Sequence, residues 1–177
     1  MANGALLSDC GKYRFVLWRE FEDVDEGYVV NFVMLNPSTA DAEKDDPTVR
    51  RCMGFARQLG ARQLFITNLY AYRATDPKDL QDNGFPVGQH NDRYLLQHAG
   101  CSDIVVCAWG SRGQPERQHH VARLLGSRKT LYCLGTTRGG SPRHPLFLAK
   151  DTPFLQYIPA PGGGPFTSQV DIINVAK

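Results

Sequence analysis

The run YVVNFVML at residues 28–35 constrains the fold more than any other feature, because Asn31 is its only strongly polar member. A strand without apolar–polar alternation suits the centre of a parallel sheet that is covered on both faces. The run stops at Asn36-Pro37, where proline removes a backbone donor and disfavours a continued ladder. A strand buried on both faces needs helices on both sides, so this run predicts an α/β fold.

Further apolar runs alternate with helical patterns along the chain. Strands are expected at 13–18, 28–35, 63–68, 104–109 and 130–134, and helices at 47–59, 88–99 and 115–125. Asp46-Pro47 has the composition of a helix cap followed by proline at the first helical position. The alternation predicts a three-layer α/β/α fold with a mainly parallel central sheet.

The remaining segments define the expected domain organisation. Residues 69–87 form a long connection, which in a compact domain is usually functional or contains a short helix. We expect one domain over residues 1–158. Residues 159–177 are expected to form a flexible Pro/Gly link, APGGGP, and a tail that ends in the apolar run VDIINV.

Composition excludes several classes of protein. With 42% hydrophobic and 21% charged residues the chain is globular, and it has no apolar run of membrane-spanning length. The N-terminal residues do not resemble a secretory signal, so a cytoplasmic location is expected. Five cysteines without a CxxC pair argue against a disulfide framework and a cysteine zinc site. The net charge of +2 does not fit a general DNA-coating protein, but allows a local basic patch.

Polar loops follow three of the expected strands, and ligands bind at the carboxyl ends of strands in open α/β sheets. Asn36, held extended by Pro37, either positions a water or carbonyl or only begins a turn. Of the acids Asp41, Asp45 and Asp46, one is expected to cap the next helix, and the others to bind water, to bind a metal or to be solvated.

The other two loops offer base-reading and histidine chemistry. The Asn68 amide, at the end of an apolar strand, can make the paired hydrogen bonds that read a base edge. Tyr70 is expected either to stack on a base or to pack in the core. His144 lies between two prolines, and this stiffness suits an imidazole that donates to a developing oxyanion. Leu146 and Phe147 follow, either as a wedge in a base stack or as core residues.

At these residues the chain resembles two families. Over most of its length up to about Phe147 it resembles an uncharacterised bacterial family, through MLNPSTAD, DDPTVRRC, NLYAYRATDP, AWGSRG and PRHPLF. More distantly, the order of VMLNPSTAD, LFITNLYAYRAT, IVVCAWG and SPRHPLF is similar to that in the uracil-DNA glycosylase superfamily. The second resemblance implies a uracil-DNA glycosylase-like fold and a base-excising activity without metal or cofactor.

The superfamily resemblance also implies roles for single residues. Asn36 would position the attacking water, with Asp45 or Asp46 in place of the missing carboxylate at position 36. Asn68 would read the base with Leu35, Ser38 and Tyr70, and His144 would stabilise the leaving base. The DNA contacts would come from a final set of residues: Arg73, Arg138, Arg143, Leu146 and Phe147.

Ser38 is a departure from the superfamily pattern, because uracil enzymes have a bulky tyrosine that blocks substituents on C5 of the pyrimidine. The serine predicts a pocket for 5-substituted pyrimidines, such as the modified bases of phage DNA, and a role in phage defence is one interpretation beside repair and salvage. The expected partner is a flipped base in DNA, bound by a monomer that does not contact membranes. The alternatives are a binder of modified bases or nucleotides that does not cleave them, and a nucleoside or nucleotide hydrolase or transferase on the same scaffold.

Overall fold

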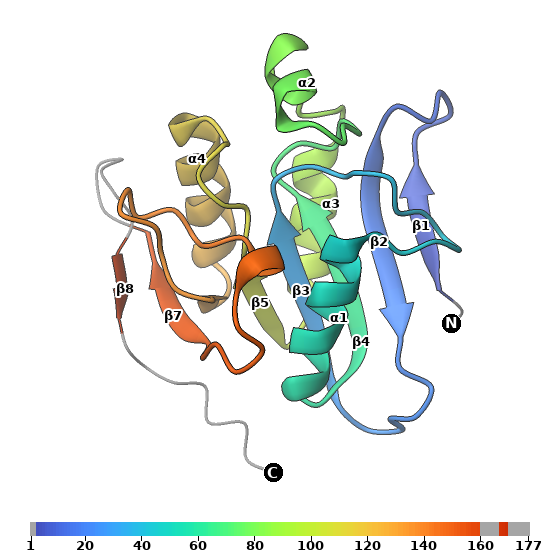
Figure 1. The fold of residues 1–177 in the computed structure, drawn as a ribbon, viewed down its shortest axis with the longest axis vertical. Coiled ribbons are helices and arrows are strands. Elements are labelled where there is room, and N and C mark those ends of the chain that lie inside the picture. Colours follow the sequence, from blue (N-terminus) through green and yellow to red (C-terminus); the bar gives the residue numbers. More distant parts are fainter. Residues whose placement is uncertain (1–2, 160–166, 170–177) are drawn as a thin grey trace.

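The computed structural model describes residues 3–159 and 167–169 and shows one twisted sheet with helices on both faces (Figure 1). The sheet has eight strands in the order β1-β2-β4-β3-β5-β6-β7-β8. The strands span Gly4–Leu7 (β1), Arg14–Glu20 (β2), Tyr28–Met34 (β3), Ala61–Asn68 (β4), Ile104–Cys107 (β5), Leu131–Cys133 (β6), Leu155–Ile158 (β7) and Thr167–Gln169 (β8). The helices span Pro47–Gln58 (α1), Pro77–Asp82 (α2), Asn91–Gly100 (α3) and Pro115–Gly126 (α4), and a 3₁₀ turn spans Pro145–Phe147 (η1).

The direction of the strands corrects the prediction of a mainly parallel sheet. The four central strands, β4, β3, β5 and β6, are parallel to one another. On both sides of them each further strand is antiparallel to its neighbour, in the pairs β4–β2, β2–β1, β6–β7 and β7–β8. The parallel centre follows from the helical crossovers α1, α3 and α4. No such helix lies between β6 and β7, whose long connection instead contains η1 and returns the chain in the opposite direction. The sheet is therefore mixed.

Helix α1 begins and ends as the sequence predicts. The Asp46 side chain accepts a hydrogen bond from the Val49 amide at 2.8 Å, and Pro47 occupies the first turn. The helix is followed by Gly60 at φ 69°, a conformation that glycine adopts without a steric penalty. The cap fixes Asp46 beside the carboxyl end of the sheet.

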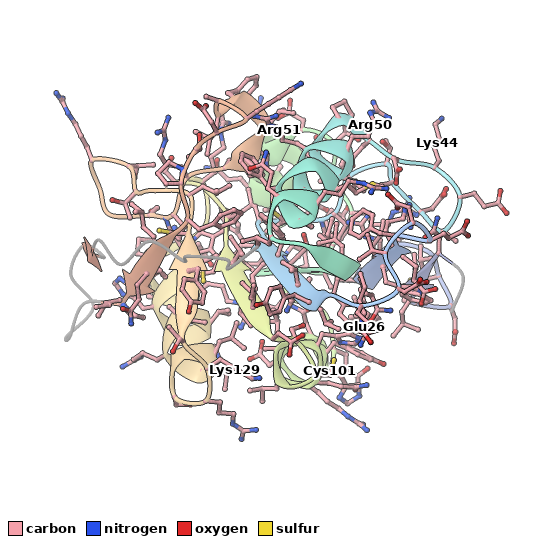
Figure 2. All side chains as sticks on the ribbon, turned by 90° about the horizontal axis from the view of Figure 1, so that it is seen from below. Glu26, Lys44, Arg50, Arg51, Cys101 and Lys129 are labelled. Atoms are coloured by element: carbon pink, nitrogen blue, oxygen red, sulfur yellow. The ribbon has the colours of Figure 1, made fainter. Side chains whose placement is uncertain are left out.

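The two faces of the sheet have separate apolar cores. Side chains of β3 such as Phe32 pack with α1, whereas those at alternate positions such as Val33 pack with α3 and α4. Figure 2 shows α1, with Arg50 and Arg51, on one side of the sheet, and Cys101 and Lys129 after α3 and α4 on the other. The alternation along β3 explains why its sequence is apolar almost throughout.

Five elements were not predicted as such, namely strand β1, helix α2, the turn η1, and strands β7 and β8. Helix α2 lies inside the long connection 69–87, which had been expected to be functional or to contain a helix. Strand β7 ends the expected domain at residue 158, and β8 pairs with it from within the expected tail. The apolar run VDIINV and the whole APGGGP link lie outside the described residues. Within the described part of the chain, no helix is long and apolar enough to cross a membrane.

Candidate functional site

A cleft of about 540 Å³ opens at the carboxyl ends of the parallel strands. Its walls come from the three loops that the sequence singles out, which are far apart along the chain. They include nine of the predicted site residues, which are Leu35, Asn36, Ser38, Asp46, Asn68, Arg143, His144, Leu146 and Phe147. Four others, Asp45, Tyr70, Arg73 and Arg138, do not line the cleft.

The amide of Asn36 has a fixed orientation at the end of β3. Its Nδ2 donates to the carbonyl oxygens of Pro37 at 3.0 Å and Ala74 at 2.8 Å. The Ala74 amide returns a hydrogen bond to Pro37 at 2.9 Å, which joins this loop to the chain after β4. The Asn36 Oδ1 atom has no hydrogen-bond partner within the described residues, so it is the atom left to accept from a water or ligand. Asn36 therefore has a structural role through its nitrogen and an open acceptor in its oxygen.

The two adjacent aspartates have different surroundings. Asp46 lines the cleft, and its Oδ1 caps α1. Asp45 lies outside the cleft lining, where its Oδ1 accepts from Arg19 Nε at 2.9 Å and pairs with the second guanidinium nitrogen at 2.8 Å. Of the two carboxylates predicted to act as a base, only Asp46 is placed to contact a bound ligand.

His144 lines the cleft with an imidazole whose tautomer is fixed by a backbone contact. Its Nδ1 accepts from the backbone amide of Leu146 at 3.3 Å. In a neutral imidazole one nitrogen accepts and the other carries the hydrogen, so this contact places the hydrogen on Nε2. Burial lowers the pKa of His144 from its ordinary value, and the nearby Asp46 carboxylate opposes this only in part. The side chain is thus a neutral donor at physiological pH.

Asn68 forms part of the cleft lining from the last residue of β4. Its side chain is completely buried, and neither Nδ2 nor Oδ1 has a hydrogen-bond partner in the described structure. A buried amide without partners costs about 1–3 kcal/mol for each unsatisfied group. Because both atoms are shielded from solvent, a ligand reaches them only after a lining side chain moves. The neighbour in the β3–β4 register is Met34, a flexible side chain that also lines the cleft.

An exposed aromatic side chain stands at the mouth of the cleft. Phe147 is 88% exposed, whereas the preceding Leu146 is half-buried. The 3₁₀ turn that carries both residues is fastened to α1 by Arg51, whose guanidinium donates to the carbonyl oxygens of Pro145 and Leu148. In Figure 1 this short orange turn lies beside α1. Phe147 is therefore an apolar side chain held out in solvent by an anchored turn, as the wedge hypothesis requires.

The charges of the cleft are mostly positive. Arg14, Arg112 and Arg143 line it, against the single carboxylate of Asp46. Such a site favours ligands with negative charge. The predicted DNA contact Arg138 is exposed on the loop outside the lining.

Arg73 and Tyr70, which were predicted to contact DNA and base, both make hydrogen bonds within the fold. Arg73 donates to the carbonyl oxygens of Ser38 and Gly11, which joins two loops. Tyr70 is buried in the core on the α3–α4 side, and its hydroxyl accepts from the Gln114 amide at 3.0 Å. The core alternative for Tyr70 is the one that the structure supports.

Sequence reasoning missed several residues of the lining. These are Arg14 on β2, the segment 109–112 after β5, Thr48 and Val49 on α1, Thr137, and Ala74 and Thr75. In the sequence the motif AWGSRG contributes only to a family resemblance. In the structure the Gly110 amide donates to the Pro142 carbonyl oxygen at 2.8 Å, which joins this segment to the loop that carries His144. A polar segment after a buried strand was the signal available for residues 110–112.

Unsatisfied polar atoms gather at this cleft. Arg14 Nε, both amide atoms of Asn68 and Thr137 Oγ1 are buried without partners in the described structure, and all three residues line the cleft. Buried polar groups in folded proteins are nearly always hydrogen-bonded, so each exception calls for an explanation. A ligand or an ordered water bound in the cleft would supply partners for these groups.

The comparison with known families gives one result. Residues 14–146 match the family described as a protein of unknown function, DUF1643. The chain belongs to this family. The matched region begins at Arg14 and ends at Leu146, so it includes every lining residue of the cleft except Phe147 and Leu148. No curated protein and no solved structure shows a significant match.

Metal chemistry has no visible site in the part of the chain that the structure describes. No group of three or more His, Cys, Asp or Glu side chains is arranged there to hold a metal ion. The functional groups at hand are those of the cleft itself, namely amides, an imidazole, a carboxylate and guanidinium groups.

Proposed function

We propose that this protein is a DNA glycosylase, which hydrolyses the N-glycosidic bond of a pyrimidine nucleotide turned out of DNA into the cleft. The observation that carries the proposal is the Asn68 amide, buried at the cleft with both its donor and its acceptor unused. A pyrimidine edge presents an acceptor beside a donor and would supply both missing partners. The uracil-DNA glycosylase-like fold belongs to this proposal, and the helices on both faces of the sheet are compatible with it.

The neighbouring groups support the chemistry of base removal. The C1′–N bond breaks with its electron pair on the base, and a water oxygen bonds to C1′. The neutral Nε2–H of His144 donates to the base oxygen on which negative charge develops. Asn36 Oδ1 accepts a hydrogen bond from the water and orients it, and Asp46 takes up the proton that the water loses.

The mouth of the cleft supports a DNA ligand. Phe147 is exposed on an anchored turn, and an apolar side chain there can fill the gap that a flipped base leaves in the stack. Arg112 and Arg143 line the same cleft and provide positive charge for the phosphate backbone. Ser38, a small lining residue, leaves room for a substituent on the pyrimidine, so we include 5-substituted pyrimidines among the substrates.

The test is the formation of abasic sites by the purified protein. Duplexes would contain uracil, a thymine mismatch, 5-hydroxymethylcytosine or glucosylated cytosine, and alkali would reveal the abasic product. We expect release from at least one of them, and a loss of about 100-fold or more in His144→Ala, as for removal of an oxyanion donor. His120→Ala is the matched control, because His120 is exposed on α4 and does not line the cleft. A folded protein that releases no base from the panel would contradict the proposal.

A second candidate function is a binder that recognises a modified base without excising it. It is favoured because the two residues assigned to the attacking water already have structural roles. Asn36 Nδ2 donates to two backbone carbonyl oxygens, and Asp46 Oδ1 caps α1. Binding of one of the modified duplexes without abasic product would identify this function. Binding that weakens steeply with added salt would separate either DNA function from hydrolysis of free nucleosides.

A further inference from the structure

Arg14, the first residue of β2, is a buried arginine at the cleft. Its side chain is only 2% exposed, and it lines the cleft together with Asn68. One guanidinium nitrogen donates to the Ala40 carbonyl at 2.6 Å, which helps to hold the loop that follows Asn36. The Nε atom is buried without a partner in the described structure. A guanidinium has five N–H donors, so most of its capacity is unused.

The charge of Arg14 is likewise unpaired. It forms no ion pair with any described residue; Asp46 is close enough to favour its charged form but does not contact it. Burial is the main reason that its pKa falls to about 10, and Arg73 and Arg19 act in the same direction. A charge that is buried without a partner is costly, and such groups are normally paired in folded proteins.

Arg19 shows how the same strand satisfies a buried arginine when the role is structural. Arg19 is also 2% exposed, but its Nε and one terminal nitrogen bind the Asp45 carboxylate. The same terminal nitrogen also donates to the Asp41 carbonyl oxygen at 2.7 Å, and the third nitrogen donates to the Trp18 carbonyl oxygen at 2.8 Å. The two arginines differ in their partners and not in their burial. Of the two, only Arg14 lacks an acidic partner within the described chain, so a ligand is the source left for an anion at this residue.

We propose that Arg14 binds an oxyanion carried by the ligand, a phosphate or carboxylate oxygen, at the inner wall of the cleft. The planar guanidinium fork is matched to such groups, and the bond is charge-assisted. Asp46, on the cleft lining nearby, keeps the anion on the arginine side by repulsion. This inference rests on the proposed function for the nucleotide nature of the ligand and assigns a further recognition group to that site.

The oxyanion has two chemical sources, which a binding experiment separates. The probes are deoxycytidine, deoxycytidine 5′-monophosphate and 5-carboxydeoxycytidine, titrated into the whole protein by calorimetry. We expect one anionic probe to bind at least about 10-fold more tightly than deoxycytidine, as befits a hydrogen bond between charged groups. Preference for the monophosphate assigns the backbone phosphate, and preference for the carboxyl compound assigns a substituent of the base. Equal affinities for all probes, or no binding, would overturn the inference.

Variants locate the effect. Arg14→Gln should reduce the preference for the anion to within about 2-fold, and Arg14→Lys should retain part of it through its charge. Arg50→Gln removes an equal charge from the exposed face of α1 outside the cleft and should leave the preference unchanged. A preference that survives in Arg14→Gln would overturn the inference.

A measurement on the unaltered protein covers the case in which Arg14→Gln does not fold. The Arg14 Nε–H signal in a ¹H–¹⁵N spectrum should shift with the preferred anionic probe and not with deoxycytidine; no selective shift would contradict the inference. The result is also independent of catalysis. If the protein prefers the anion but forms no abasic sites, the inference about Arg14 stands and the proposed glycosylase activity is wrong. If it forms abasic sites without any preference for the anion, the proposed activity stands and the inference is wrong.

Discussion

Two buried carboxamides, Gln118 and Asn68, show the difference between a structural group and a candidate binding group. Gln118 of α4 accepts from Trp109 Nε1 at 3.0 Å and from Ser141 Oγ at 2.9 Å, and donates to the Gly113 carbonyl at 2.6 Å. Asn68 has the same functional group and equal burial but no partner for its amide in the described structure. The first amide joins α4 to two of the loops that build the cleft, and the second has both its donor and its acceptor unused. The contrast predicts opposite effects of the same kind of substitution.

The largest effect is expected for Gln118→Leu. This change leaves the Trp109 nitrogen, the Ser141 hydroxyl and the Gly113 carbonyl without their partner. Three unsatisfied groups at about 1–3 kcal/mol each should lower the free energy of unfolding by about 4 kcal/mol, measured by urea denaturation. A loss below about 1 kcal/mol would mean that Gln118 is not a structural junction.

Asn68→Leu should have the opposite sign. It removes a buried donor and acceptor that have no partners, so the free energy of unfolding should rise by about 1 kcal/mol while base release and ligand binding are lost. Asn91→Leu is the matched control, because the Asn91 Nδ2 donates to the backbone oxygens of Asn68 and Leu69. That variant should lose about 2 kcal/mol. Destabilisation by Asn68→Leu comparable to that of Asn91→Leu would break the comparison.

Two hydroxyls in one loop repeat the contrast on a smaller scale. Ser141 donates to Gln118, whereas Thr137 Oγ1 is buried at the cleft without a described partner. Ser141→Ala should cost about 1 kcal/mol in urea denaturation. Thr137→Val, which keeps the shape of the side chain, should change stability by less than about 0.5 kcal/mol and weaken ligand binding. Equal losses in both variants would show that the two hydroxyls have the same role.

The smallest effect concerns the charge of His144 and its pH dependence. Burial lowers its pKa in the folded protein, so the unfolded chain takes up a proton more readily. Its contribution to stability is therefore complete above the ordinary pKa of 6.5 and is lost as the pH falls through the lowered folded value. Relative to His144→Gln, the wild-type protein should lose stability between pH 7.5 and pH 5, measured by urea denaturation. His98, whose pKa burial also lowers, is present in both proteins and cancels. A constant difference would show that His144 is not held neutral by the fold.

Much of the fold could be predicted from local patterns. The apolar run of β3, the Asp46-Pro47 cap and the glycine after α1 each report a local preference, and the structure confirms the elements that they indicate. Strands β1, β7 and β8 were not predicted because strands of three or four residues have little periodicity of their own. The mixed direction of the sheet depends on the β6–β7 connection and on which strand β2 joins, and the local composition decides neither of them.

The site could be predicted only where it lies at the end of a recognisable strand. Asn36, Asn68 and His144 follow apolar runs, and the structure brings them to one cleft. Arg14 was not predicted because it is unusual only in being buried without an ion-pair partner. Both its burial and its lack of a partner depend on segments that are distant in the sequence. The choice between Asp45 and Asp46 is likewise non-local, since Arg19 from another strand binds the first of them.

Helix α1 carries both the Asp46 wall of the cleft and the Arg51 clamp on the turn with Phe147. The spacing between the Asp46 wall and the Phe147 ring is thus set by the first part of α1, because Asp46 and Arg51 are separated by less than two helical turns. A helical segment does not stretch, so the distance between the Asp46 wall and the Phe147 turn is fixed. If the protein turns a base out of DNA, as proposed above, the duplex has to adapt to this distance, and sequences or lesions that bend and unstack easily would be bound before stiff ones.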